Sequence, residues 1–428
     1  MMSATDPPTG SQLHWSVRRS SGRSNAVLGV VDQALSSLTN LAAVLAAAAM
    51  LSVTEFGIFA AVYAAYLIAS GASQALVSQD LVLAVGDEPD MARRMIAAMA
   101  FTAWFSTVPV AALLMPGFLL DGLGPSLIAL ALLTPFLLVQ DTIRFGCSIL
   151  GSMRLAVVLD AVWGALLIAG VWTVSSLPDV PRSSAMLTAV WGTAGAVSGI
   201  LGVILIVRHL PRTGPLNLRG AYLRRDFLGL RFLVEFLAVR GSSQALALIL
   251  GALAGIAATG ALRGATTLFG PLTMLLLAAS TFAIPIIRSQ DRAHQDRILI
   301  SLATALALLA GAMTVVFLAI PDTWGERLLG QTWSIAEPLT LPVGLQVMAL
   351  ALSSIGYTAL RMSAPTKTLS LRLIGALVQM VFFFGGYQVD GVQGAVWGLA
   401  AAAWVQAGLN AASYARESRT VRDERKSH

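Results

Sequence analysis

The chain of 428 residues has little charge, one cysteine and four histidines. Only 12% of its residues are charged, against about 25% in a typical soluble domain, so most of the chain is not expected to face water. The single Cys147 excludes an internal disulfide and a cysteine metal cluster. The histidines stand in tails or polar connections, which leaves none for a metal site or a general base inside a membrane. No metal site is expected.

Apolar sequence is what the chain has in abundance: 56% of its residues are hydrophobic and its mean hydropathy is +0.76. The apolar residues form blocks of about 20 or more, which is typical of helices that span a bilayer. The pI near 10 arises from basic loops, which favours anionic membrane lipids over nucleic acid as a partner. The blocks predict an all-α integral membrane protein with about twelve spans, at 26–51, 56–84, 93–115, 125–150, 154–175, 184–207, 228–253, 257–287, 298–320, 336–360, 367–387 and 391–414.

The positions of lysine and arginine predict how these spans are oriented. With a cytoplasmic N-terminus, the inside segments hold 22 basic residues and the outside segments hold 2, Arg182 and Arg327. This split indicates that both termini face the cytoplasm. The predicted segments are a tail at 1–25, an N-lobe of six spans at 26–207, a basic inter-lobe linker at 208–227, a C-lobe at 228–414 and a tail at 415–428.

A faint internal repeat supports this division into two lobes. At an offset of 203 residues, Asp32 corresponds to Glu235 and Gly57 corresponds to Gly260. Parallel repeats with a binding site between them are a common plan in transporters. We therefore expect two pseudo-symmetric six-helix lobes around a central cavity.

Arg240 lies deep in the seventh predicted span, where a charge costs roughly 2.5–3.5 kcal/mol on insertion scales. It stands about 12 residues into the span, or roughly 18 Å, near the middle of a core about 30 Å thick. Gln244 shares its helix face, and residues 241–243 are small. This pattern is typical of a cavity wall. The guanidinium binds either an anion on a transport path or a carbonyl or acid of a neighbouring helix.

Arg263 lies about two turns into the eighth predicted span, with Thr267 one turn further along the same face. Pro271 and Pro285 predict kinks in this span, because each removes a backbone hydrogen bond. A bent helix that carries an arginine and threonines suits a gated cavity. The alternative is that Arg263 extends towards the outer headgroups.

Other charged residues lie nearer the ends of their predicted spans. Asp141 and Arg144 are three apart on a helix, and Arg231 and Glu235 are four apart, so each set is expected to pair. Arg144 is nevertheless a candidate anion contact of the cavity.

Asp32 and Asp160 stand about two turns inside their spans with no partner nearby in sequence, at a depth that water can reach. Together with Glu235, they are the candidate sites for proton or sodium coupling. No other cofactor is expected.

Two stretches resemble the polysaccharide flippase and exporter branch of the multidrug/oligosaccharidyl-lipid/polysaccharide (MOP) exporter superfamily. "LSVTEFGIFAAVYA" (51–64) is similar to the start of its second span, and "GALRGATTLFGPLTMLLLAASTFAIPIIRS" (260–289) is similar to its eighth span. The resemblance implies alternating access of two lobes that flip an undecaprenyl-pyrophosphate-linked oligosaccharide to the outer leaflet of the bacterial cytoplasmic membrane. It implies Arg240 and Arg263 as pyrophosphate contacts and glycan polymerases and glycosyltransferases as partners.

Three other functions compete with this interpretation. A proton- or sodium-coupled multidrug antiporter has the same fold, but that branch typically uses acids buried within a lobe, whereas the acids here are expected to be shallow. A membrane enzyme such as a glycan polymerase or ligase needs a sizeable outer loop, and the longest one here is about 321–337. The chain is therefore not predicted to be an enzyme, with no catalytic residue assigned. A non-transporting scaffold for glycan assembly, or a degenerate scramblase, is the third alternative.

Overall fold

The computed structural model describes residues 22–83, 88–209, 229–276, 292–363 and 367–426, and all the regular structure within these ranges is helical. The prediction of an all-α membrane protein is confirmed. The first part contains α1 (Gly22–Met50), α2 (Val53–Ser73), the π-helix η1 (Gln74–Ser78), α3 (Gln79–Leu83), α4 (Glu88–Phe105), α5 (Thr107–Leu119), α6 (Gly124–Ile149), α7 (Met153–Ser176) and α8 (Ser184–His209). The second contains α10 (Gly229–Phe236), the π-helix η2 (Leu237–Gly241), α11 (Ser242–Ala254), α12 (Ile256–Leu268), α14 (Arg292–Ala319), α15 (Asp322–Leu329), η3 (Gly330–Thr332), α16 (Trp333–Ala336), η4 (Glu337–Leu339), α17 (Thr340–Ser363) and α18 (Lys367–Lys426).

Within the described ranges, nine helices are long and apolar enough to cross a membrane. One of them, α18, contains both the eleventh and twelfth predicted spans, joined at a kink where Asp390 and Gly391 leave helical geometry. The seventh predicted span is divided into α10, η2 and α11. The eighth starts as α12 and runs into residues outside the described part, as does the linker 208–227. The count of twelve, the orientation and the segment boundaries therefore stay predictions.

Helix α2 begins with a capping interaction that its sequence encodes. The Ser52 hydroxyl accepts a hydrogen bond from the backbone N–H of Glu55 at 3.3 Å, which satisfies one of the free donors of the first turn. The Glu55 carboxylate in turn accepts from the backbone N–H of Ser184 at 2.6 Å. This contact ties the start of α8 to the start of α2.

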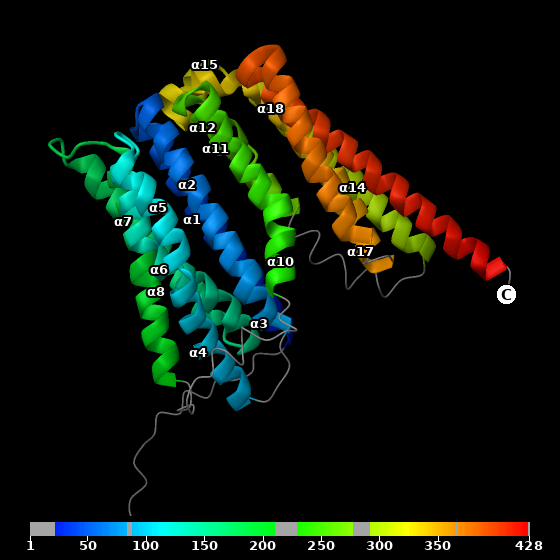
Figure 1. Cartoon of the computed structure of the whole chain (residues 1–428), viewed down its shortest axis with the longest axis horizontal. Coiled ribbons are helices and arrows are strands. Elements are labelled where there is room, and N and C mark those ends of the chain that lie inside the picture. Colours follow the sequence, from blue (N-terminus) through cyan, green and yellow to red (C-terminus); the bar gives the residue numbers. More distant parts are fainter. Residues whose placement is uncertain (1–21, 84–87, 210–228, 277–291, 364–366, 427–428) are drawn as a thin grey trace, which may run out of the picture.

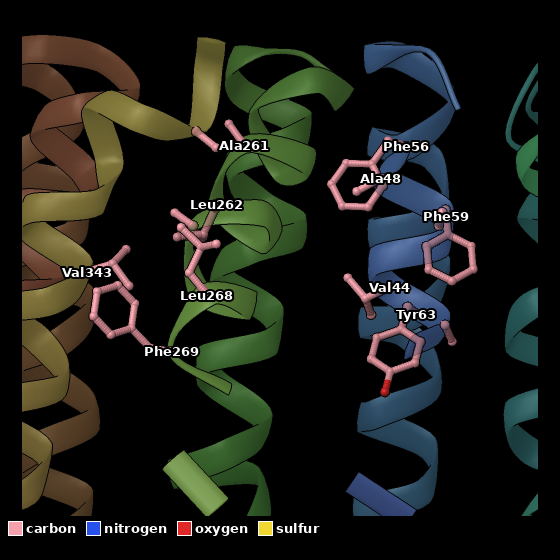
Figure 2. Close-up of a cluster of buried hydrophobic side chains, with 14 of the residues drawn as sticks. Val44, Ala48, Phe56, Phe59, Tyr63, Ala261, Leu262, Leu268, Phe269 and Val343 are labelled. Carbon is pink, nitrogen blue, oxygen red and sulfur yellow. The ribbon is translucent and has the colours of Figure 1, made fainter. Parts of the chain in front are cut away.

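Helix α2 packs closely against α12, and two glycines make this approach possible. A β-carbon on Gly57 would lie 2.3 Å from the carbonyl oxygen of Ile256, and one on Gly260 would lie 3.0 Å from the Cα of Gly57. These are the two glycines that the sequence offset of 203 relates. Figure 2 shows the apolar cluster around this contact, with Val44 and Phe56 on one side and Leu262 on the other.

The helices lie close together near α15 and spread apart towards the other end of the molecule, where α4 and α10 begin (Figure 1). Near α15, a single hydrophobic cluster includes residues of α1, α2, α12, α16 and α17. A second, smaller cluster is built mainly from α4, α6 and α7. The fold is thus most continuous at the α15 end.

Candidate functional site

A cavity of about 530 Å³ lies between the first two helices and the helices of the second part. Its polar lining consists of two arginines with amide and hydroxyl side chains, and none of its described lining residues is acidic. These polar residues are Ser37, Asn40, Arg240, Ser243, Gln244, Thr259, Arg263, Thr266, Thr267, Thr273, Gln346 and Gln379. The cavity therefore presents a net positive surface with neutral hydrogen-bonding groups around it.

Four of the five predicted anion contacts line this cavity: Arg240, Gln244, Arg263 and Thr267. Arg240 is exposed to the cavity and forms no ion pair with any residue of the described ranges. It is carried by the π-helix η2, where the wider turn interrupts the seventh predicted span. Short π-helical segments inside α-helices often occur at functional sites. Substrate binding by these residues stays a prediction.

The Arg263 guanidinium lies over the ring of Tyr63, with its central carbon 4.4 Å from the ring centroid. Its buried Nε has no hydrogen-bond partner among the described residues. The Thr267 hydroxyl donates to the carbonyl oxygen of Arg263 at 2.7 Å, so its donor is used within the helix and its oxygen can still accept. The contact with Tyr63 links α12 to α2 at the cavity wall.

The internal repeat at an offset of 203 residues also relates the residues that line the cavity. Seven lining positions on α1 and α2 match seven lining positions of the second part at this spacing. The matched positions are Ser37 and Arg240, Asn40 and Ser243, Leu41 and Gln244, Val44 and Ala247, Ala60 and Arg263, Ala64 and Thr267, and Leu67 and Gly270. The two walls are therefore equivalent in position and different in charge, because both arginines stand on the second.

Sequence reasoning identified Gln244 and Thr267 but missed other neutral polar groups of the cavity, among them Ser37, Asn40 and Gln379. Asn40 has a buried side-chain oxygen without a hydrogen-bond partner in the described part of the chain. The Gln379 amide donates to the Ser243 hydroxyl at 3.1 Å, which links α18 to α11. The offset from Arg240 and Ser243 could have identified Ser37 and Asn40. No comparable signal marks Gln379.

The fifth predicted anion contact, Arg144, is not among the cavity residues and instead lies in a buried cluster of three aspartates. Its guanidinium is 3.0 Å from Asp32, 3.1 Å from Asp160 and 3.5 Å from Asp141. The expected pair with Asp141 is present, but Asp32 and Asp160 were expected to stand alone at a depth that water reaches. They are instead 5% and 1% exposed, respectively. The reason is that α1, α6 and α7 bring the four side chains together.

Neutral polar groups surround this cluster. The Ser70 hydroxyl and the Gln74 amide both donate to Asp141, the latter at 3.2 Å, and the Gln140 amide donates to Asp160 at 3.0 Å. The Oδ1 atom of Asp32 is buried with no hydrogen-bond partner in the described ranges. Three carboxylates share one guanidinium, so the site can accommodate additional positive charge.

Glu235 pairs with Arg372 of α18, at 2.8 Å, rather than with Arg231 as the i,i+4 spacing suggested. The Arg372 guanidinium also lies over the ring of Tyr357 at 4.0 Å, and the Tyr357 hydroxyl donates to Glu235 at 3.4 Å. A long-range partner on α18 thus replaces the local one, and α10, α17 and α18 meet at this point.

Solved structures of MOP superfamily transporters have this fold. An inward-facing multidrug resistance MATE family transporter aligns over 91% of this chain and 98% of its own, with 12% identity and a TM-score of 0.70. The lipid II flippase MurJ, in an inward closed conformation, aligns over 90% and 87%, with 11% identity and a TM-score of 0.66. An outward-facing multidrug resistance MATE family transporter aligns over 92% and 94%, with 15% identity and a TM-score of 0.55.

At these identities the similarity shows the fold alone. No protein-family model and no curated protein sequence matches the chain. The chain thus has the fold of the MOP superfamily transporters.

Proposed function

We propose that the protein is a transporter that flips a lipid-linked oligosaccharide, carried on a pyrophosphate such as undecaprenyl pyrophosphate. Flipping would run from the cytoplasmic to the outer leaflet of a bacterial cytoplasmic membrane, by alternating access of its two halves. The observation that carries this proposal is a cavity lined by Arg240 and Arg263 with no acidic residue in its described lining. The lipid II flippase activity of MurJ, a structural neighbour, supports the same class of substrate.

The chemistry of the lining fits the two polar parts of such a substrate. A guanidinium binds phosphate oxygens bidentately and keeps its charge in a site of low dielectric. The amides of Gln244, Gln346 and Gln379 can both donate to and accept from sugar hydroxyls. A cavity of about 530 Å³ is in the usual range for small-ligand sites, so it would hold the pyrophosphate and nearby sugars. The polyprenyl tail would remain in the bilayer.

The test is flipping of a fluorescent pyrophosphate-linked oligosaccharide in proteoliposomes. Arg240→Gln and Arg263→Gln should each lower the flipping rate by about 10- to 100-fold, because a hydrogen bond to a charged group contributes about 1.5–3 kcal/mol. Arg154→Gln is the matched control, since Arg154 is exposed at the start of α7 and does not line the cavity. Wild-type flipping by both cavity variants at equal protein amount would contradict the proposal.

A second candidate is a multidrug antiporter coupled to protons or sodium, the activity described for the MATE neighbours being multidrug resistance. The cluster of Arg144 with Asp32, Asp141 and Asp160 supports ion coupling, because it holds more acidic than basic groups. If this candidate is right, Asp160→Asn should abolish ion-driven drug efflux while Arg240→Gln leaves it intact. The flippase proposal requires the opposite ranking of these variants for glycan flipping.

The proposed partners are anionic lipids at the basic cytoplasmic segments and the polymerases and glycosyltransferases of glycan assembly. Five basic residues fall in the last stretch of α18, from Arg416 to Lys426. Binding to vesicles with anionic lipid, compared with neutral vesicles, tests the first of these partners. Genes for glycan assembly beside this gene would support the second.

A further inference from the structure

The segment 322–339, which comprises α15, η3, α16 and η4, is a compact unit at the end where the helices converge (Figure 1). The Trp333 indole N–H, at the start of α16, donates to the carboxylate of Asp322, the first residue of the unit, at 3.1 Å. Its ring lies against Gly325, where a β-carbon would approach it to 2.1 Å. Trp333 is 2% exposed, so the segment has its own buried centre.

This segment contacts both halves of the chain. On one side it packs against α12 and α17, and on the other it packs against α1 and α2. At α12, a β-carbon on Gly264 would touch Ala336 at 3.3 Å and Leu329 at 3.5 Å. Gly264 directly follows the cavity residue Arg263. The segment therefore covers the cavity helices at the end opposite to the spread one.

The contact with α1 is the tightest of these. Gly330 has a φ of +55°, and a β-carbon there would lie 2.4 Å from the carbonyl oxygen of Ala48. Ala48 stands one helical turn from Val44, which lines the cavity. Figure 2 shows Val44 and Ala48 on α1 facing the helix that carries Ala261 and Leu262.

We infer that the segment 322–339 is the gate at this end of the cavity, and that the contact between Gly330 and Ala48 is the boundary that opens. The chain joins the segment to α14 and α17, so it would move with the second half. Separation of the halves at this end would keep its packing on α12 and break its packing on α1. The inference rests on the proposed alternating access and names the surface at which it occurs.

The test uses Gly330→Asn, because asparagine is, with glycine, among the residues that occupy the positive-φ position of type II′ turns, close to the φ of +55° and ψ of −143° at Gly330, and it still brings a β-carbon against Ala48. Gly391→Asn is the matched control: Gly391 has a φ of +51° and no atom within 4 Å of an added β-carbon. Gly330 lies in a connection predicted to face outside, and Gly391 is the first residue of the twelfth predicted span, at its outer end. The two variants therefore place asparagine at the same kind of positive-φ backbone position, but only Gly330→Asn brings a β-carbon against another helix.

The readout is labelling of a cavity cysteine by a membrane-impermeant maleimide in oriented vesicles without substrate. Ala64→Cys in a Cys147→Ser background supplies a single thiol in the cavity lining. Gly330→Asn should increase labelling from the outer side about tenfold, which corresponds to about 1.4 kcal/mol in favour of the outward-open state. Gly391→Asn should label like the parent.

Unchanged outer labelling in folded Gly330→Asn would overturn the gate, as would an equal rise in Gly391→Asn. If Gly330→Asn does not fold, Gly330→Ala has a smaller side chain. Outer labelling of Gly330→Ala is then compared with that of Gly391→Ala, and the same outcomes support or overturn the gate. The measurement needs no substrate, so a wrong glycan assignment leaves it unaffected. Conversely, if Arg240→Gln loses flipping and Gly330→Asn shows unchanged labelling, the gate is refuted and the proposed flippase function is not.

Discussion

Replacing Arg144 by glutamine should destabilise the protein more than any single change in the cavity. The guanidinium is the only described cation within ion-pair distance of Asp32, Asp141 and Asp160, and its side chain is 11% exposed. Removing one partner of a buried ion pair costs about 3–5 kcal/mol, because the other charge stays buried without compensation. Here three carboxylates on α1, α6 and α7 lose the same partner. We expect Arg144→Gln to lose at least about 3 kcal/mol.

The matched variant is Asp141→Asn, which removes one carboxylate and keeps the guanidinium. Arg144 then retains Asp32 and Asp160, and the asparagine oxygen can still accept from Ser70 and Gln74. We expect a loss of about 1 kcal/mol, the usual net value of one hydrogen bond.

Thermal unfolding of the detergent-solubilised protein, followed by tryptophan fluorescence and by the monodisperse fraction, ranks the two variants. An Arg144→Gln protein that unfolds at the same temperature as Asp141→Asn would refute the reasoning. It would mean that water already compensates the carboxylates. Arg240→Gln should unfold like the wild type, because Arg240 has no ion pair in the described part of the chain to lose.

Two further predictions concern the related walls of the cavity and the α2–α12 contact. Arg240→Ser combined with Ser37→Arg keeps the charge of the cavity but moves it to the matched position on α1. We expect the flipping rate in proteoliposomes to stay at least about tenfold below wild type, because the charge is then misplaced relative to the substrate. Recovery to the wild-type rate would show that flipping does not depend on which wall carries the arginine. Gly57→Ala should cost about 1–3 kcal/mol, because its β-carbon would meet the Ile256 carbonyl at 2.3 Å. Gly408→Ala, with nothing within 4 Å, should be neutral or gain up to about 1 kcal/mol in the same thermal assay, and equal losses would contradict the close contact.

The helical membrane fold followed from the sequence because its signal is local. A block of about 20 apolar residues can satisfy its backbone in a bilayer only as a helix, whatever packs against it. The π-helices η1 and η2 left no such trace, since an extra residue in one turn changes neither apolar content nor length. The break predicted between the eleventh and twelfth spans, at 388–390, in contrast falls beside the kink that Asp390 and Gly391 form inside α18.

The sequence predicted a cavity residue correctly only where the depth of the residue along its helix decides whether it lines the cavity. Depth marked Arg240 and Arg263, and both line the cavity. The depth of Arg144 did not predict that it lies outside the cavity lining, because its partners Asp32 and Asp160 come from other helices. Tertiary packing also replaced the expected local pairing of Glu235 by a contact to α18.

The two halves share a sequence repeat but differ in where their charged residues lie. Asp32 and Glu235 occupy matched positions at the offset of 203, and each has an arginine partner. The partners are not matched: Arg144 comes from α6 and Arg372 from α18, which contain the fourth and eleventh predicted spans. Among the described residues, the first half thus holds three buried acids around one arginine, Arg144, and the second half holds both cavity arginines, Arg240 and Arg263. If the two halves move against each other as we propose, this asymmetry separates the proposed anion site in the second half from the proposed ion site in the first.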